Sequence, residues 1–236
     1  MARNVLILKA GTAAHSVRVG AGDYDRWFLR ALGSADRRFR VVQADQRERL
    51  PGRVRDHDAI LVTGSPGSMV EPEAWMLRMG EYLRDAAEQR VPVLGVCFGH
   101  QVLGHVCGGK VRRSARGREL GTVTCELTAE GREDPLFDGV PARFDVQATH
   151  EDVVEEGSGE MEILATNAHT DNQAFRVGRY IRAVQFHPEV DAATMRGLIE
   201  SRAAQLEAGR VRALFAGIRP TPHGTKILEN FLHHFT

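Results

Sequence analysis

Residues 93–101, which read VLGVCFGHQ, decide the fold of this chain. A short apolar run leads into the pattern Gly95-x-Cys97-x-Gly99 and then into a segment with the character of a helix. A strand that passes into a helix in this way predicts a nucleophile elbow, in which the reactive residue lies on a sharp, strained turn. The two glycines leave room where β-carbons would collide. We therefore predict a strand–turn–helix unit with Cys97 at its apex.

Cys97 is the candidate nucleophile of this unit. Its thiol would face the N-terminus of the following helix, whose partial positive charge favours the thiolate. Most cysteines are buried and inert, but one that lies between two glycines at the end of an apolar strand matches the pattern of a reactive residue. Cys107 and Cys125 lack both an elbow and a neighbouring base, and we expect them to be bystanders.

The segments around the elbow alternate between apolar strands and helices. Strand patterns fall at 5–8, 39–44, 58–63 and 92–96. Helical patterns fall at 24–32 and 72–90, and a third helix follows the elbow and ends near Gly108 and Gly109. Such an alternation predicts an α/β fold with a mostly parallel central sheet and helices on both faces.

The second half of the chain changes character. Strand candidates follow one another closely at 120–127, 142–148, 161–165, 173–177 and 181–186. Helices return at about 192–208 and 225–234. With no repeat or long linker, residues 1–236 read as a single domain whose second half carries extra strands.

His187 is the candidate base. The strand pattern that ends at Phe186 is followed by His187-Pro188-Glu189. Residues two apart in extended backbone point to the same side, so Glu189 can lie beside the imidazole of His187 and orient it. Of the other histidines, only His150 has a comparable context, and His100 belongs to the helix after the elbow.

Acyl transfer also requires hydrogen-bond donors for the developing oxyanion. The backbone N–H of Phe98, directly after the nucleophile, would be one donor. The second would come from the loop 63–68, which reads TGSPGS and follows the third strand. A loop at the carboxyl end of a parallel strand is where ligand sites form in such sheets.

Composition narrows the class of protein. The 236 residues include 31 Lys and Arg and 31 Asp and Glu, so the net charge is zero, which argues against a nucleic-acid binder. No apolar run approaches the roughly 20 residues of a membrane span, and the N-terminal apolar stretch is too short for a signal peptide. Three cysteines without a C-x-x-C pair fit neither a disulfide framework nor a zinc site. We expect a cytoplasmic protein without a bound metal.

These residues resemble the class I, or triad-type, glutamine amidotransferases. The elbow at 95–101, the loop at 63–68 and the stretch QFHPE at 185–189 carry the resemblance, which covers nearly the whole chain. Free-standing proteins similar to the glutaminase domain of GMP synthetase look closest. The resemblance implies a flavodoxin-like arrangement of the sheet and no cofactor.

The resemblance also implies roles for matching residues. Cys97 would form a γ-glutamyl thioester, with His187 as base and then acid and Glu189 orienting it. Ser65 and Phe98 would supply oxyanion N–H groups, although many relatives carry glycine where Ser65 stands. The positions that match those holding the amino and carboxylate groups of glutamine are Gly67, Gln101, Glu151 and Asp152. His150 could equally be a substrate contact or part of the framework.

Three functions remain open. A glutaminase would release glutamate and ammonia, with the ammonia passing to a synthase on a separate chain, because nothing in these residues resembles an acceptor domain. The same triad could instead cleave γ-glutamyl peptides or amides. A silent scaffold that binds a metabolite is the third reading, and the intact triad argues against it.

Two further signals are weaker than they look. Residues 104–110 spell G-x-x-x-x-G-K, but Val111 replaces the required Ser or Thr, and the motif closes a helix where a phosphate loop must open one. The arginines at 112, 113, 116 and 118 could meet an anionic ligand, but a solvated loop is the simpler expectation.

Overall fold

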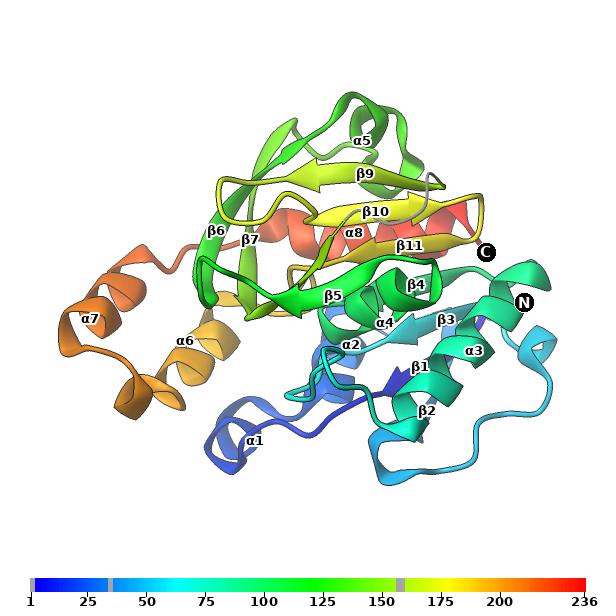
Figure 1. The fold of residues 1–236 in the computed structure, drawn as a ribbon, viewed down its shortest axis with the longest axis horizontal. Helices are drawn as coiled ribbons and strands as arrows, with labels where there is room; N and C mark the ends of the chain where they lie inside the picture. Colours follow the sequence, from blue (N-terminus) through cyan, green and yellow to red (C-terminus); the bar gives the residue numbers. More distant parts are fainter. Residues whose placement is uncertain (1–2, 34–35, 156–159) are drawn as a thin grey trace.

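A nine-stranded sheet forms the centre of the molecule (Figure 1). The computed structural model describes residues 3–33, 36–155 and 160–236. The sheet order is β2-β1-β3-β4-β11-β10-β9-β6-β7, and β5 and β8 pair separately. The strands are β1 (Arg3–Lys9), β2 (Arg37–Gln43), β3 (Ala59–Val62), β4 (Val93–Val96), β5 (Lys110–Arg113), β6 (Glu119–Leu127), β7 (Arg143–His150), β8 (Asp152–Glu155), β9 (Met161–Thr166), β10 (Ala174–Val177) and β11 (Ile181–Val184).

The half of the sheet that holds β2, β1, β3, β4 and β11 is parallel. β1 pairs in parallel with β2 and β3, and β4 pairs in parallel with β3 and β11. Every residue of β3, β4 and β11 is buried, as expected for parallel strands with both faces covered. The strand that follows β1 in sequence, β2, lies on one side of β1, whereas β3 and β4 lie on the other side. The strand order therefore reverses between β1 and β3, and ligands bind outside the carboxyl ends of the strands at such a switch point. The predicted parallel α/β architecture is confirmed.

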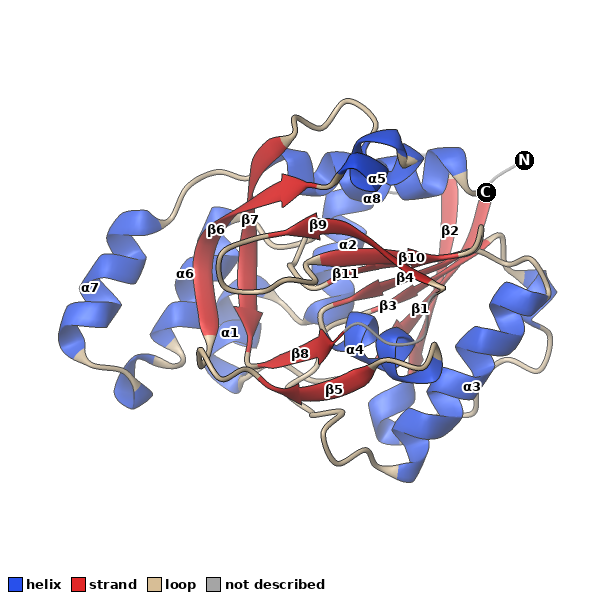
Figure 2. Ribbon diagram, turned by 45° about the horizontal axis from the view of Figure 1, so that its top comes forward, coloured by secondary structure: helices blue, strands red, loops and turns tan. Residues whose placement is uncertain are grey.

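Helices cover both faces of the sheet (Figure 2). α3 and α4 pack on one face, whereas α2 and α8 pack on the other. Side chains that alternate along β1 divide between the two cores, with Leu6 and Leu8 facing α3 and α4, and Val5 and Ile7 facing α2 and α8. The helices are α1 (His15–Ala21), α2 (Tyr24–Leu32), α3 (Ala74–Glu88), α4 (Phe98–Val106), α5 (Ala129–Glu133), α6 (Ala192–Glu200), α7 (Ala208–Gly217) and α8 (Pro222–His234), with short 3-10 turns at η1 (Ala44–Gln46), η2 (Val54–Asp56), η3 (Pro135–Phe137) and η4 (Ala203–Gln205).

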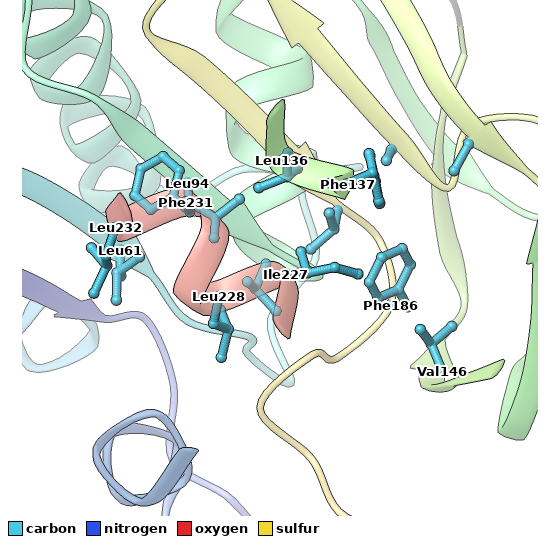
Figure 3. Close-up of a cluster of buried hydrophobic side chains, with 14 of the residues drawn as sticks. Leu61, Leu94, Leu136, Phe137, Val146, Phe186, Ile227, Leu228, Phe231 and Leu232 are labelled. Carbon is cyan, nitrogen blue, oxygen red and sulfur yellow. The ribbon is translucent and has the colours of Figure 1, made fainter. Parts of the chain in front are cut away.

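Helix α8 anchors the end of the chain in one of these cores (Figure 3). Ile227 and Phe231 are fully buried in the cluster that also holds Phe186. The ring of Phe186 lies edge-on to that of Phe144, with centroids 5.9 Å apart. Burying a phenylalanine side chain contributes about 1.5–3 kcal/mol to stability. Phe186 therefore holds the backbone in place immediately before His187.

The half of the sheet from β11 to β7 contains the extra strands predicted for the second half of the chain, and its pairing is antiparallel, which the sequence did not indicate. β10 pairs antiparallel with β11 and β9, and β6 pairs antiparallel with β7 and β9. β5 and β8 were not predicted, because charged residues interrupt their short apolar pattern. β11 ends at Val184, so the predicted strand 181–186 is two residues too long.

The segment that contains α6 and α7 corrects another prediction. In place of one helix over 192–208, α6 ends at Glu200, and α7 begins only at Ala208. α6 packs against α1 through Val17, Met195 and Ile199. α7 extends beyond β6 and β7, at the end of the molecule opposite α3 (Figures 1 and 2). This segment lies between the strand end that carries His187 and the anchoring helix α8.

Candidate active site

Cys97 lies in the turn between β4 and α4. Its φ of 53° and ψ of −99° are strained for a residue with a β-carbon. A β-carbon on Gly95 would lie 2.4 Å from the carbonyl oxygen of Gly99, and one on Gly99 would lie 2.9 Å from the carbonyl oxygen of Val62. The predicted elbow, and the reason for its two glycines, are confirmed. Cys97 is 5% exposed, at the N-terminus of α4.

His187 and Glu189 form a buried pair beside this turn. The Nδ1 of His187 lies 2.8 Å from Oε1 of Glu189, and both side chains are almost fully buried. Burial alone would lower the pKa of His187, but the charges of Glu189 and Cys97 and hydrogen bonds to both outweigh it and raise that pKa to about 10. Nε2 has no other partner among the described residues, so it is the nitrogen left for the thiol.

The loop after β3 closes over this pair. A β-carbon on Gly64 would lie 2.8 Å from Cε1 of His187 and 3.1 Å from Cε1 of Tyr24, so the loop can approach both rings only because residue 64 is glycine. Three residues further along the loop, the N–H of Gly67 donates to Oγ of Ser65 at 3.0 Å. Gly67 would therefore contact a ligand through atoms other than this N–H.

The two candidate oxyanion donors are the backbone N–H groups of Ser65 and Phe98. Within residues 3–33, 36–155 and 160–236, the backbone N–H groups of Ser65 and Phe98 donate to no protein acceptor. Phe98 begins α4, where the first N–H groups of a helix have no partner within the helix. Both donors come from loops at the carboxyl ends of adjacent strands, β3 and β4. The geometry is therefore compatible with their stabilising a negative oxygen near Cys97.

A small cavity of about 90 Å³ opens at the thiol. It gathers the sequence-predicted residues except Phe98 and Glu189. The ring of Phe98 is buried and stacks on Trp75, with centroids 6.0 Å apart, while Glu189 lies behind His187. The cavity is lined by Tyr24, Ser65, Pro66, Gly67, Ser68, Cys97, Gln101, Arg113, Arg118, Thr149, His150, Glu151, Asp152, His187 and Arg202.

Gln101 and Ser68 hold one wall of the cavity. The side-chain amide of Gln101 donates to the backbone carbonyl of Asp152 at 3.1 Å. The hydroxyl of Ser68 donates to Oδ2 of Asp152 at 2.5 Å. Asp152 is thus fixed from both α4 and the loop after β3, and the backbone at 151–152 has one defined position at the cavity.

The ring of His150 is held by hydrogen bonds within the protein framework, although the residue also lines the cavity. Nε2 of His150 lies 2.7 Å from Oε2 of Glu119, and Nδ1 lies 3.1 Å from the carbonyl oxygen of Asp152. Glu119 also accepts hydrogen bonds from Asn167 and Gln173. Burial alone would raise the pKa of Glu119, but these hydrogen bonds and the charge of His150 outweigh it and lower that pKa. Both ring nitrogens of His150 are therefore committed within the protein.

The arginine run is not the simple solvated loop that we expected. Arg112 and Arg113 belong to β5. Arg113 and Arg118 line the cavity, and both pair with Glu151, at 3.3 Å and 2.8 Å. Arg116 remains exposed and donates to two backbone carbonyls. The folding back of β8 onto β5 brings the run to the cavity, and no local sequence pattern shows this contact.

Sequence reasoning assigned no role to Tyr24 and Arg202. The N-cap residue Asp23 accepts hydrogen bonds from the N–H groups of Ala13 and Tyr24, and so fixes the start of α2 at the cavity. Burial, reinforced by the charge of Cys97, raises the pKa of Tyr24. Arg202 reaches the cavity because α6 ends at Glu200 rather than continuing. A capping aspartate before Tyr24 was a readable signal, whereas the sequence around Arg202 offers none.

The residues that the structure describes contain no candidate metal site, either in this cavity or outside it. No group of three or more His, Cys, Asp or Glu side chains among them could hold a metal ion.

Burial raises the pKa of Cys125 well above its ordinary value and that of Cys107 to about 11. No helix among the described residues is long and apolar enough to span a membrane.

Known proteins resemble this chain over most of its length. Residues 21–203 match the family described as glutamine amidotransferase class-I. The glutamine-hydrolysing GMP synthase of Thermomicrobium roseum is 38% identical over 136 residues, which cover 56% of this chain and 23% of that protein. The matched stretch is thus about a quarter of that synthase. Gamma-glutamyl peptidase 4 of Arabidopsis thaliana is 26% identical over 200 residues, covering 83% of this chain and 78% of that protein.

Solved structures share the fold. A crystal structure of a glutamine amidotransferase from Thermotoga maritima aligns with a TM-score of 0.78 at 22% identity, covering 100% of this chain and 98% of that one. A glutamine amidotransferase from Methylobacillus flagellatus aligns with a TM-score of 0.76, also at 22% identity, covering 100% of this chain and 94% of that one. At this level of identity the alignments show the fold alone. They confirm the mostly parallel sheet and the extra antiparallel strands.

Proposed function

This chain belongs to the class I glutamine amidotransferase family, and on that premise we propose that it hydrolyses the side-chain amide of glutamine through a thioester on Cys97. The observation that carries the proposal is the elbow at Cys97 beside the buried pair of His187 and Glu189. A thiol at a helix N-terminus, a base and a carboxylate that orients the base are the parts that nucleophilic acyl transfer requires.

In the first step, Nε2 of His187 takes the thiol proton, and the sulfur of Cys97 attacks the amide carbon of glutamine. The carbonyl oxygen becomes an oxyanion that accepts hydrogen bonds from the N–H groups of Phe98 and Ser65. The C–N bond then breaks, His187 returns the proton to the nitrogen, and ammonia leaves a γ-glutamyl thioester. Glu189 stabilises the imidazolium form of His187 throughout this step.

In the second step, water attacks the thioester carbon. His187 takes a proton from this water, and the oxyanion forms again in the same place. Collapse breaks the C–S bond, glutamate leaves, and the proton returns to the sulfur of Cys97. Hydrolysis therefore consumes only glutamine and water, and needs no cofactor.

We also propose that the wall formed by Gly67, Gln101 and the backbone at 151–152 holds the amino and carboxylate groups of the glutamyl portion. Its support is the rigid placement of Asp152 by Gln101 and Ser68. Residues 1–236 would act as one glutaminase-type unit in the cytoplasm, and the ammonia would pass to a synthase on a separate chain.

The proposal is tested by ammonia release from glutamine. The unmodified chain should release ammonia, and Cys97→Ala should abolish the release. Cys107→Ala, the same change at a cysteine without an elbow, serves as the matched control and should retain activity. A glutamine-analogue electrophile should label Cys97 in a stoichiometric way. Release that persists in Cys97→Ala would overturn the assignment of the nucleophile.

Hydrolysis of γ-glutamyl peptides is the second candidate function. The match to gamma-glutamyl peptidase 4 over most of both chains favours it. Amine release from γ-glutamyl dipeptides, measured beside ammonia release from glutamine, separates the two substrates. If neither is cleaved and the electrophile fails to label Cys97, the reading as a non-catalytic scaffold gains support.

A further inference from the structure

The cavity at Cys97 contains a cation that the proposed chemistry leaves unused. Three arginines line it, and two of them, Arg113 and Arg118, pair with Glu151. The third, Arg202, has no carboxylate partner among the residues that the structure describes. A partly buried guanidinium without a counter-ion is electrostatically suited to an anionic ligand.

The position of Arg202 is fixed by one side of its guanidinium. Nη1 donates to the carbonyl of Leu198 at 3.0 Å and lies 3.3 Å from the hydroxyl of Ser201. Nε and Nη2 donate to no acceptor in the described part of the chain. These two nitrogens form the edge of the guanidinium that presents parallel N–H groups, the geometry that matches a carboxylate in a bidentate pair.

Arg202 lies near Tyr24, which is itself a neighbour of His187 in the cavity. It lies close enough to Tyr24, Arg118 and Cys97 to interact electrostatically with all three. The rings of Tyr24 and His187 both lie against Gly64, so Tyr24 is a neighbour of the base. Because His187 must protonate the departing nitrogen, the leaving group lies near the base and hence near Arg202. The wall that holds the glutamyl portion is built from other residues.

We propose that Arg202 binds a carboxylate of the leaving group, so that among γ-glutamyl amino acids and peptides those with a free carboxylate close to the scissile amide bind most tightly. This inference rests on the proposed function, since it takes the γ-glutamyl carbon to lie at Cys97 and specifies only what is released. Glutamine releases ammonia, which offers Arg202 no carboxylate. A γ-glutamyl amino acid would therefore gain a contact at Arg202 that glutamine lacks.

The test compares two ligands that differ only in that carboxylate. Binding of γ-glutamylglycine and of γ-glutamylglycinamide is measured by calorimetry on the full chain carrying Cys97→Ala, which binds without turnover. Adding Arg202→Gln should weaken binding of γ-glutamylglycine by about 10- to 100-fold, as expected for a charge-assisted bidentate pair, and leave the glycinamide unchanged. Arg202→Lys should restore part of the loss. Arg212→Gln, an exposed arginine in α7, is the matched control.

Kinetics on the unmodified nucleophile provide a second readout. Arg202→Gln should raise KM for γ-glutamylglycine while leaving kcat nearly unchanged, because the lost contact is made equally in the ground and transition states. An equal loss for both ligands, no loss for either, or no binding of γ-glutamylglycine would each overturn the proposal. Failure of the proposed function is a different result, in which both ligands bind but the unmodified chain releases no amine.

Discussion

Replacing Gly95 by alanine should lower both the catalytic rate at the elbow and the stability of the fold. The new β-carbon would lie 2.4 Å from the carbonyl oxygen of Gly99, whereas β-carbons essentially never approach closer than 3.0 Å, and ordinary contact begins at 3.4 Å. The first turn of α4 must therefore move by between 0.6 and 1.0 Å relative to β4. That turn carries Cys97 and the N–H of Phe98. A displacement of about 1 Å at reacting groups lowers catalytic rates by about 100-fold.

The same crowding should destabilise the fold by about 1–3 kcal/mol, the usual effect of overpacking. Activity is measured as ammonia or amine release, and stability as the free energy of unfolding from urea denaturation. Gly197→Ala is the matched control, because a β-carbon there meets nothing within 4 Å. The control should keep its activity and gain up to about 1 kcal/mol from the lower flexibility of the unfolded chain. A Gly95→Ala protein with the activity and stability of the control would refute the reasoning.

Three further predictions concern buried groups of the site. Glu189→Gln should lower the pKa of His187 from about 10, as read by NMR titration of its ring. Because the pKa of an unfolded histidine is about 6.5, the pair of His187 and Glu189 stabilises the native state fully below that pH, and this stabilisation is lost as the pH rises through about 10. If the free energy of unfolding of this variant changed with pH between 7 and 10 in parallel with that of the wild type, the prediction would be contradicted. Glu119→Gln should cost about 1.5–3 kcal/mol in urea denaturation, because it removes a charged acceptor from His150, and unchanged stability would refute that role. Gly64→Ala should displace the ring of His187, because Cε1 of that ring lies 2.8 Å from the new β-carbon, and should abolish most activity with little loss of stability. Full activity would contradict this prediction, since it would show that the loop can move away from the ring without effect on the reaction.

The parallel half of the fold could be predicted because its strands are buried on both faces. Runs such as 58–63 and 92–96 are apolar almost throughout, and turns or helices bound them. α2 was predicted with its observed bounds, since its amphipathic pattern begins directly after the capping residue Asp23. β5 and β8 escaped prediction because they are short and partly exposed, and because they pair across about forty residues of chain.

The predicted part of the active site is the part built by backbone geometry. The elbow glycines and the His-x-Glu spacing determine local shape, so a single sequence can show them. The partners of Glu151, and the position of Arg202, depend on where distant segments fold back onto the cavity. His150 illustrates the difference: its sequence context fits a ligand contact equally well, and only the folded neighbourhood of Glu119 assigns it to the framework.

The backbone ladder between β4 and β11 has a consequence for how this protein can diversify. The N–H of Cys97 donates to the carbonyl of Val184 at 2.8 Å, so Cys97 and the strand that leads to His187 are joined by main-chain hydrogen bonds. Such bonds depend little on which side chains surround them. Residues that line the cavity, including those between α6 and α7, can therefore change in the course of evolution while the alignment of Cys97 with His187 is kept.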